Sequence, residues 1–104
     1  MHPIDCLPPL RETLEKHGLQ AKKTFGQNFL FDLNLTHKIS HIAALTAEDT
    51  AIEIGPGPGG LTRALLKTPA HKVLAIEIDP RAISILEELK HLEDQRLTII
   101  QGDA

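Results

Sequence analysis

Residues with useful chemistry follow three apolar runs of the chain. Gly55 and Gly57 come directly after "AIEI", Glu77 closes "KVLAIE", and Asp103 follows "RLTIIQG". A glycine adopts positive φ readily and lets a ligand approach the backbone. An acid about 20 positions after the first glycine is placed to accept the hydroxyl protons of a ribose. Asp103 would reach the base edge if Glu77 holds the sugar, so we expect a ligand that contains a nucleoside.

Each of these signals also has an ordinary explanation. Glycine-rich turns follow many strands, and a single acid at a strand end is often a helix cap or a solvated charge. Asp79 in particular stands before Pro80, where it can cap the next helix. The coincidence of the signals at three successive strand ends therefore carries the inference, rather than any one of them.

The elements that must position these residues form a βαβαβ pattern. "KVLAIEID" is a near-continuous apolar run, typical of a strand buried on both faces of a parallel sheet. The crossover helix from Pro80 to Leu92 has an apolar face predicted from Ile83, Leu86 and Leu89 or Lys90. The predicted strands cover 51–54, 72–79 and a third segment, 96–104, that runs into a turn; the crossover helices cover 61–67 and 80–92. In such α/β sheets ligands bind outside the carboxyl ends of the strands.

Two helices are expected before the first strand. In "PPLRETLEKHGL", Pro9 suits the first turn of a helix and Gly18 its end. In "DLNLTHKISHIAAL", Asp32 or Asn34 is a candidate N-cap. The spacing predicts a buried face on this second helix, made of Leu35, Ile39, Ile42 and Ala43.

The glycine loop does not fit a pyrophosphate well. "GPGPGG" matches the dinucleotide pattern G-x-G-x-x-G, which presents backbone N–H groups to phosphates. Pro56 and Pro58 remove two of those donors. S-adenosyl-L-methionine has an adenosine and no phosphate, so it fits this loop better than NAD. A NAD-dependent oxidoreductase remains the less favoured alternative.

Composition sets wider limits. The 104 residues carry a net charge of −3, which predicts no nucleic-acid surface by itself. The single Cys6, the lack of a long apolar segment and the lack of a signal peptide are typical of a cytoplasmic protein. The chain stops at Ala104, where a third strand would meet its loop, so we expect the N-terminal portion of a longer enzyme.

Four segments together resemble one protein family. "KKTFGQNFLFD", "IEIGPGPGGLT", "AIEID" and "QGDA", in this order, closely resemble the small-subunit ribosomal RNA adenine dimethyltransferases, the KsgA (RsmA) family. The resemblance implies the first half of a Rossmann-like, doubly wound, class I S-adenosylmethionine-dependent methyltransferase. It implies N6,N6-dimethylation of two adjacent adenines near the 3′ end of 16S rRNA in the 30S subunit or its precursor, by a monomeric cytoplasmic enzyme.

Two related activities stay open. The first is that of the erythromycin-resistance methyltransferases, which modify 23S rRNA. The second is that of a non-catalytic RNA-binding or transcription-factor module on the same fold.

The resemblance also assigns roles to residues. Asn28 and Leu30 would line the cofactor pocket, and Gly55 would lie against the methionine and ribose. Glu77 would hold the ribose hydroxyls and Asp103 the adenine amino group. Weaker candidates for cofactor contact are Gln27, Gly57 and Ile78.

Other expectations concern what the chain contains. Residues 1–31 would form an extension with a cofactor-lid motif, and 32–104 a helix plus the cofactor-binding half of the catalytic domain. The family's Asn-Leu-Pro-aromatic motif, which grips the target adenine, would lie beyond Ala104, as would the C-terminal domain. We therefore expect no catalytic residue and no methyl transfer from this chain alone.

Two pairs of basic or metal-binding side chains need separate interpretations. Lys22 and Lys23 are candidate contacts to rRNA phosphates, although a solvated charge pair explains them equally well. His37 and His41 stand one helical turn apart, but no acid or cysteine completes a ligand set, so we predict no metal site.

Overall fold

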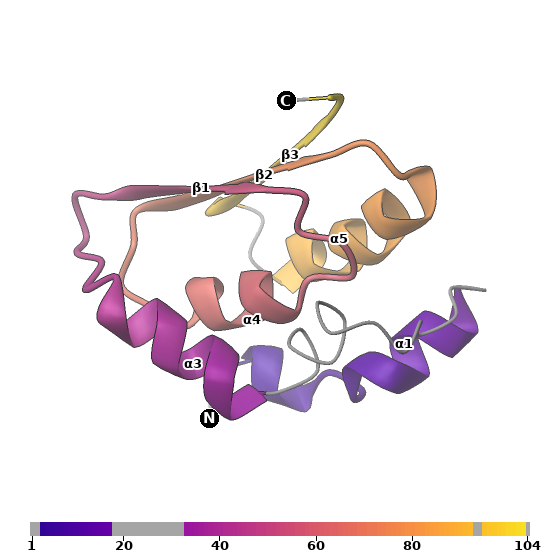
Figure 1. Cartoon of the computed structure of the whole chain (residues 1–104), viewed down its shortest axis with the longest axis horizontal. Coiled ribbons are helices and arrows are strands. Elements are labelled where there is room, and N and C mark those ends of the chain that lie inside the picture. The colour runs from indigo at the N-terminus through magenta and orange to yellow at the C-terminus, as the bar shows by residue number, and fades with distance from the viewer. Residues whose placement is uncertain (1–2, 18–32, 93–94, 104) are drawn as a thin grey trace.

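We describe a computed structural model of the chain for residues 3–17, 33–92 and 95–103. The elements run along the chain as η1 (Pro3–Cys6), α1 (Leu10–Lys16), α3 (Leu33–Ile42), β1 (Thr50–Ile54), α4 (Gly60–Leu66), β2 (Lys72–Glu77), α5 (Pro80–Leu92) and β3 (Leu97–Gln101). The strands lie above the helices in Figure 1. Among the described residues, no helix has the length and apolar character needed to cross a membrane.

The sheet confirms the predicted βαβαβ unit. Its three strands are parallel in the order β1-β2-β3. Thr50 pairs with Lys72, and Glu77 pairs with Gln101, so the strands end at a common edge. The helices α4 and α5 both lie on one side of this sheet (Figure 1). The first half of a doubly wound α/β fold is therefore present.

The core lies between the sheet and these two helices. Its buried members are Ile4 from η1, Leu65 and Leu66 from α4, Val73 and Ala75 from β2, Leu86 and Leu89 from α5, and Leu97 from β3. Burial of apolar side chains stabilises a fold by about 25 cal/mol per Å². This cluster therefore fixes α4 and α5, and with them the loops at the ends of the strands.

The other face of the sheet is open among the described residues. Ile52 and Ile54 of β1 are 61% and 68% exposed, and Leu74 and Ile76 of β2 are only half-buried. The prediction that 72–79 is buried on both faces is therefore wrong for this chain. Successive side chains of a strand point to opposite faces, and the described helices cover only one of them.

The helix predictions are confirmed in position and corrected in detail. Pro9 is the N-cap of α1 and not part of its first turn. On α3 the expected apolar face is wrong at Ile42, which is 72% exposed, and at Ala43, which lies beyond the helix end. Thr36 and Ser40 are buried instead. The packing side of α3 is thus set by small hydroxyl residues that allow close approach to α4.

Three further details concern elements near these helices. On α5, Leu86 and Leu89 are buried as predicted, whereas Ile83 and Lys90 are only half-buried. The helical turn η1 was not expected. Asp32 and Gly18 lie outside the described residues, and so do the side chains of Asn34 and Leu35.

Arg96 organises the amino end of the sheet. Its guanidinium donates to the carbonyl oxygens of Leu66 at 2.6 Å, Thr68 at 2.7 Å and Ala70 at 2.9 Å. These carbonyls belong to the end of α4 and to the turn that follows it, where a helix leaves acceptors unpaired. One side chain therefore satisfies the turn that leads into β2.

Candidate functional site

The loop between β1 and α4 has the backbone that its glycines predict. Gly55 and Gly57 have φ values of +68° and +55°, and Gly59 joins them at +94°. A Cβ added to Gly55 or Gly57 would meet no atom within 4 Å, so the space beside them is open. At Gly59 it would lie 3.0 Å from Leu89 Cδ1. The first two glycines are therefore accessible to a ligand, whereas Gly59 is a packing residue.

The amide groups of this loop are already engaged. Gly55 donates to Ile76 O at 2.9 Å, and Gly59 donates to Pro56 O at 3.1 Å. Gly57 donates to Glu77 Oε1 at 2.8 Å. Because Pro56 and Pro58 have no N–H, residues 55–59 keep no backbone donor for a phosphate. This arrangement supports the exclusion of a pyrophosphate cradle at the loop.

Glu77 is the centre of the strand-end site. Its side chain is 7% exposed, and its Oε2 accepts the N–H groups of Ile78 at 2.8 Å and Asp79 at 3.0 Å. With the bond from Gly57, this carboxylate joins the end of β2 to the glycine loop. A carboxylate oxygen has about two lone-pair sites, so Oε1 retains capacity for one more donor.

The end of β3 lies next to Glu77. Gly102 donates its N–H to the main-chain oxygen of Glu77 at 2.9 Å, and the exposed Asp103 follows. The carboxyl ends of all three strands thus bring the glycine loop, Glu77 and the start of Asp103's turn to one edge, as the strand pattern predicts. The side chain of Ile78, at the same edge, is 62% exposed.

Several candidate residues lie outside the described part of the chain. They are Lys22, Lys23, Gln27, Asn28 and Leu30. Their assigned roles stay predictions.

The structure adds Glu53 and Thr62, which the sequence patterns did not single out. Thr62 is fully buried, and its hydroxyl donates to Glu53 Oε1 at 2.5 Å. Burial raises the pKa of Glu53, the hydrogen bond from Thr62 opposes that rise, and the nearby carboxylate of Glu77 adds to it. Glu53 alternates with Ile52 and Ile54, so the apolar pattern of "TAIEI" favours the isoleucines for the covered face and gives no signal for this carboxyl group.

Asp79 has a structural role at this edge. Its Oδ1 accepts the N–H of Arg81 at 2.9 Å, and its Oδ2 lies 3.1 Å from Arg81 Nη2. The hydrogen bond from the Arg81 side chain lowers the pKa of Asp79. The expectation that Asp79 caps the next helix is therefore confirmed, and the residue is not needed as a ligand.

Comparison with known proteins identifies the family. The family model for ribosomal RNA adenine dimethylase matches residues 18–104. The chain belongs to this family.

Its curated relatives are close in sequence. Ribosomal RNA small subunit methyltransferase A of Agrobacterium fabrum is 55% identical over the whole chain, and that of Afipia carboxidovorans is 59% identical. The chain spans 38% and 37% of these two proteins.

Solved structures of related proteins have the same fold. A dimethyladenosine transferase from Plasmodium falciparum superposes with a TM-score of 0.59 at 38% identity, over 68% of this chain and 26% of that protein. The 23S rRNA methyltransferase ErmE superposes with a TM-score of 0.60 at 34% identity, over 69% of this chain and 29% of that one. Both confirm the Rossmann-like methyltransferase class that the family resemblance implies.

Proposed function

We propose that this chain binds S-adenosyl-L-methionine for an rRNA adenine N6,N6-dimethyltransferase. The observation that carries the proposal is the glycine loop joined to Glu77 at the carboxyl edge of the sheet. Its open glycines admit a ligand, and its backbone donors are used internally. A cofactor that has a ribose and no phosphate matches this combination.

Each residue at the edge would have a distinct task. The backbone at Gly55 would lie against the ribose and methionine of the cofactor, because no side chain occupies that space. Glu77 would accept a ribose hydroxyl at the free lone pair of Oε1, while its other bonds hold the carboxylate in place. Asp103 would accept a hydrogen bond from the adenine amino group.

Further cofactor contacts would come from other parts of the chain. Asn28 and Leu30 would complete the pocket. Gln27, Gly57 and Ile78 would add weaker contacts.

The substrate follows from the relatives. The proteins at 55% and 59% identity are named small-subunit methyltransferases, whereas the 23S rRNA enzyme ErmE is 34% identical. We therefore favour two adjacent adenines near the 3′ end of 16S rRNA, within the 30S subunit or its precursor, over a 23S target. A monomeric, cytoplasmic protein is part of the same proposal.

The bound cofactor supplies an electrophilic methyl group on a sulfonium, which is a good leaving group. This chain's own residues need only hold and orient that cofactor, since proximity and alignment supply much of the rate. No residue of the strand-end site is needed as an acid or a base for the transfer.

Calorimetric titration of the chain with S-adenosyl-L-methionine and with NAD tests the proposal. We expect saturable binding of S-adenosyl-L-methionine and no binding of NAD. The Glu77→Gln variant should bind S-adenosyl-L-methionine at least about tenfold more weakly, a difference of about 1.4 kcal/mol in binding free energy. Glu48→Gln changes an exposed acid before the amino end of β1, away from the carboxyl ends of the strands, and should bind as the wild type does. Binding of NAD alone would contradict the proposal.

A further inference from the structure

A basic groove runs along the helical side of the molecule. It consists of two adjoining cavities of about 350 Å³ each, which share His37 of α3 and Lys67 at the end of α4. The basic and imidazole side chains that line this groove are Arg11, His37, His41, Arg63 and Lys67. Among its described lining residues, Asp5 is the only carboxylate. Two elements, α1 and α4, therefore turn positive groups toward one concave surface, and α3 adds two imidazoles.

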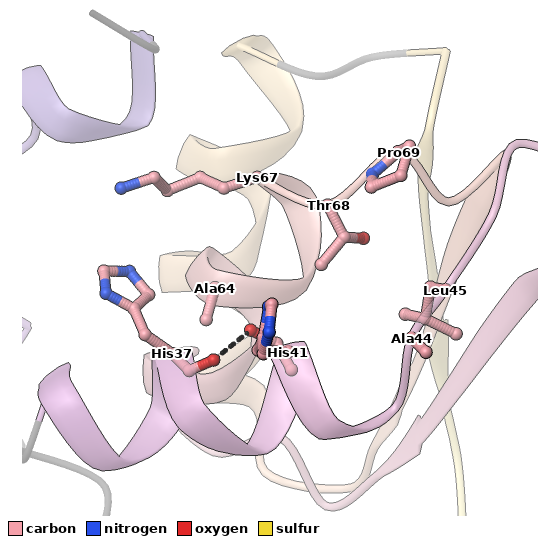
Figure 2. Close-up of a pocket in the computed structure, with 9 residues that line it drawn as sticks. His37, His41, Ala44, Leu45, Ala64, Lys67, Thr68 and Pro69 are labelled. Carbon is pink, nitrogen blue, oxygen red and sulfur yellow. Dashed lines mark hydrogen bonds between the residues drawn. The ribbon is translucent and has the colours of Figure 1, made fainter.

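Figure 2 shows how the first cavity is built. His37 and His41 rise from α3 toward α4, and Lys67 extends from α4 on the same side as His37. Thr68 and Pro69 close one end of the cavity. The described residues contain no group of three or more potential metal ligands, so these imidazoles are better explained as donors to an anion than as metal ligands.

The groove has hydrogen-bond donors to spare. Arg63 donates from Nη1 to Pro8 O at 2.9 Å and from Nη2 to Thr13 Oγ1 at 3.4 Å, while its buried Nε has no partner. The ammonium of Lys67 lies 2.6 Å from Asp5 Oδ1, which uses one of its three protons. Lys67 therefore keeps donors for a ligand beyond its ion pair, whereas the Arg63 side chain is largely engaged within the protein.

The charge of the groove is opposite to that of the strand-end site. Glu53, Glu77, Asp79 and Asp103 lie at the carboxyl edge of the sheet, and the whole chain has a net charge of −3. The glycine loop precedes α4, and Lys67 follows α4. The strand-end site and the groove therefore lie at opposite ends of this helix, which is about 10 Å long. The groove is therefore separate from the surface that would hold the cofactor.

We propose that this groove binds the phosphate backbone of the RNA substrate. Guanidinium groups match phosphate oxygens in pairs, and cations from α1 and α4 beside the imidazoles of α3 suit the repeated charges of a nucleic acid better than an isolated carboxylate. The inference rests on the proposed function, since an rRNA methyltransferase must hold its substrate by contacts beyond the target base. Such contacts set register and orientation and do not read sequence.

The test is fluorescence anisotropy with a labelled RNA hairpin from the 3′ end of 16S rRNA, titrated with the chain at several KCl concentrations. Arg11→Gln with Lys67→Gln should weaken binding at least about tenfold. It should also reduce the slope of log K against log[KCl] by about 1.4 to 1.8, which corresponds to two lost phosphate contacts in the loop or the stem. Because Lys67 also holds Asp5, Arg11→Gln with His37→Gln serves as a second variant that keeps that ion pair.

Matched controls separate the groove from net charge. Lys38→Gln with Lys72→Gln removes two exposed cations that line neither cavity, one of them from α3 itself. This variant should keep the affinity and slope of the wild type. Equal losses in groove and control variants would overturn the proposal, as would no RNA binding by the wild type or equally effective competition by polyglutamate. Calorimetry with S-adenosyl-L-methionine on the same samples reports the proposed function separately.

Discussion

The two ends of the parallel sheet have different roles. At the amino end, Arg96 donates to three carbonyl oxygens, and the turn into β2 is satisfied within the protein. At the carboxyl end, three glycines hold positive φ and Glu77 is kept in place by three backbone N–H groups. The first arrangement stabilises the fold. The arrangement at the carboxyl end keeps open a surface beside the glycines, which residues with larger side chains would block.

This difference separates stability from binding. Polar groups at the amino end contact one another and leave little for a ligand. At the carboxyl end the space beside Gly55 and Gly57 is open, and the carboxylate that faces the loop is already oriented. Substitutions at the amino end should therefore change the free energy of unfolding, and those at the carboxyl end should change ligand affinity first.

Arg96→Met should give the largest effect on stability. Methionine keeps an apolar stem but leaves the carbonyls of Leu66, Thr68 and Ala70 without their charged donor. Because hydrogen bonds to charged groups contribute about 1.5–3 kcal/mol each and water can replace part of this, we expect a loss of about 3 kcal/mol in urea unfolding. Arg96→Lys, which keeps the charge without the planar group, should lie between. A loss below about 1 kcal/mol would show that the hydrogen bonds of Arg96 at the amino end do not stabilise the fold as described.

Two alanine substitutions distinguish the packing glycine of the loop from a glycine that lies beside open space. Gly59→Ala should destabilise the chain by about 2 kcal/mol, since it adds a contact with Leu89 to a strained φ. Gly55→Ala should cost about 1 kcal/mol, from the φ alone.

Cofactor affinity should follow the reverse order. After correction for the unfolded fraction, Gly55→Ala should lower the affinity for S-adenosyl-L-methionine about tenfold and Gly59→Ala should leave it within about threefold, differences of about 1.4 and 0.65 kcal/mol. Equal affinity in the two variants would mean that the space beside Gly55 is not the binding surface.

Asp79 tests whether every acid at the carboxyl edge is a ligand. Asp79→Ala removes the cap of α5 and should cost about 1 kcal/mol of stability, whereas Asp79→Asn keeps a capping acceptor and should cost less. Neither should change cofactor affinity measured on folded protein. A clear loss of affinity in the asparagine variant would assign Asp79 to the cofactor.

Glu53 should give the smallest effect, and it depends on pH. Its pKa in the fold is raised above the ordinary value of 4.5, so the folded chain binds this proton more tightly than the unfolded chain does. Its contribution to stability is then full below pH 4.5 and is lost as the pH rises through the folded pKa. Asp79 and Glu88 have lowered pKa values, and they oppose this trend.

The comparison with Glu53→Gln isolates that contribution. The wild type should become less stable relative to the glutamine variant between about pH 4 and pH 7, in a series of thermal melts. A difference that stays constant with pH would show that the carboxyl group of Glu53 titrates normally.

Much of the scaffold could be predicted from the sequence because its signals are local. The apolar runs and the glycine loop indicated strands, crossover helices and a common carboxyl edge, and the positive φ at Gly55 and Gly57 follows from the lack of a Cβ. Asp79 before Pro80 indicated a helix cap, because this signal too lies in adjacent residues.

The remaining features depend on contacts distant in sequence. Nothing near Arg96 indicates that it satisfies the turn after α4, because its acceptors lie 26 to 30 residues earlier. The bond between Thr62 and Glu53 likewise joins a helix to a strand. Apolar spacing misplaced Ile42, since the packing of α3 on α4 uses Thr36 and Ser40. Local patterns predict elements, whereas tertiary contacts decide which of their faces are buried.

The most direct test of the account is an NMR titration of the ¹⁵N-labelled chain with S-adenosyl-L-methionine. We expect the amide signals of Gly55, Gly57, Ile78 and Asp103 to shift with one common dissociation constant, while those of Thr68, Ala70 and Arg96 stay in place. Shifts confined to the amino end of the sheet, or no shift at millimolar cofactor, would contradict the assignment of the carboxyl edge as the binding site.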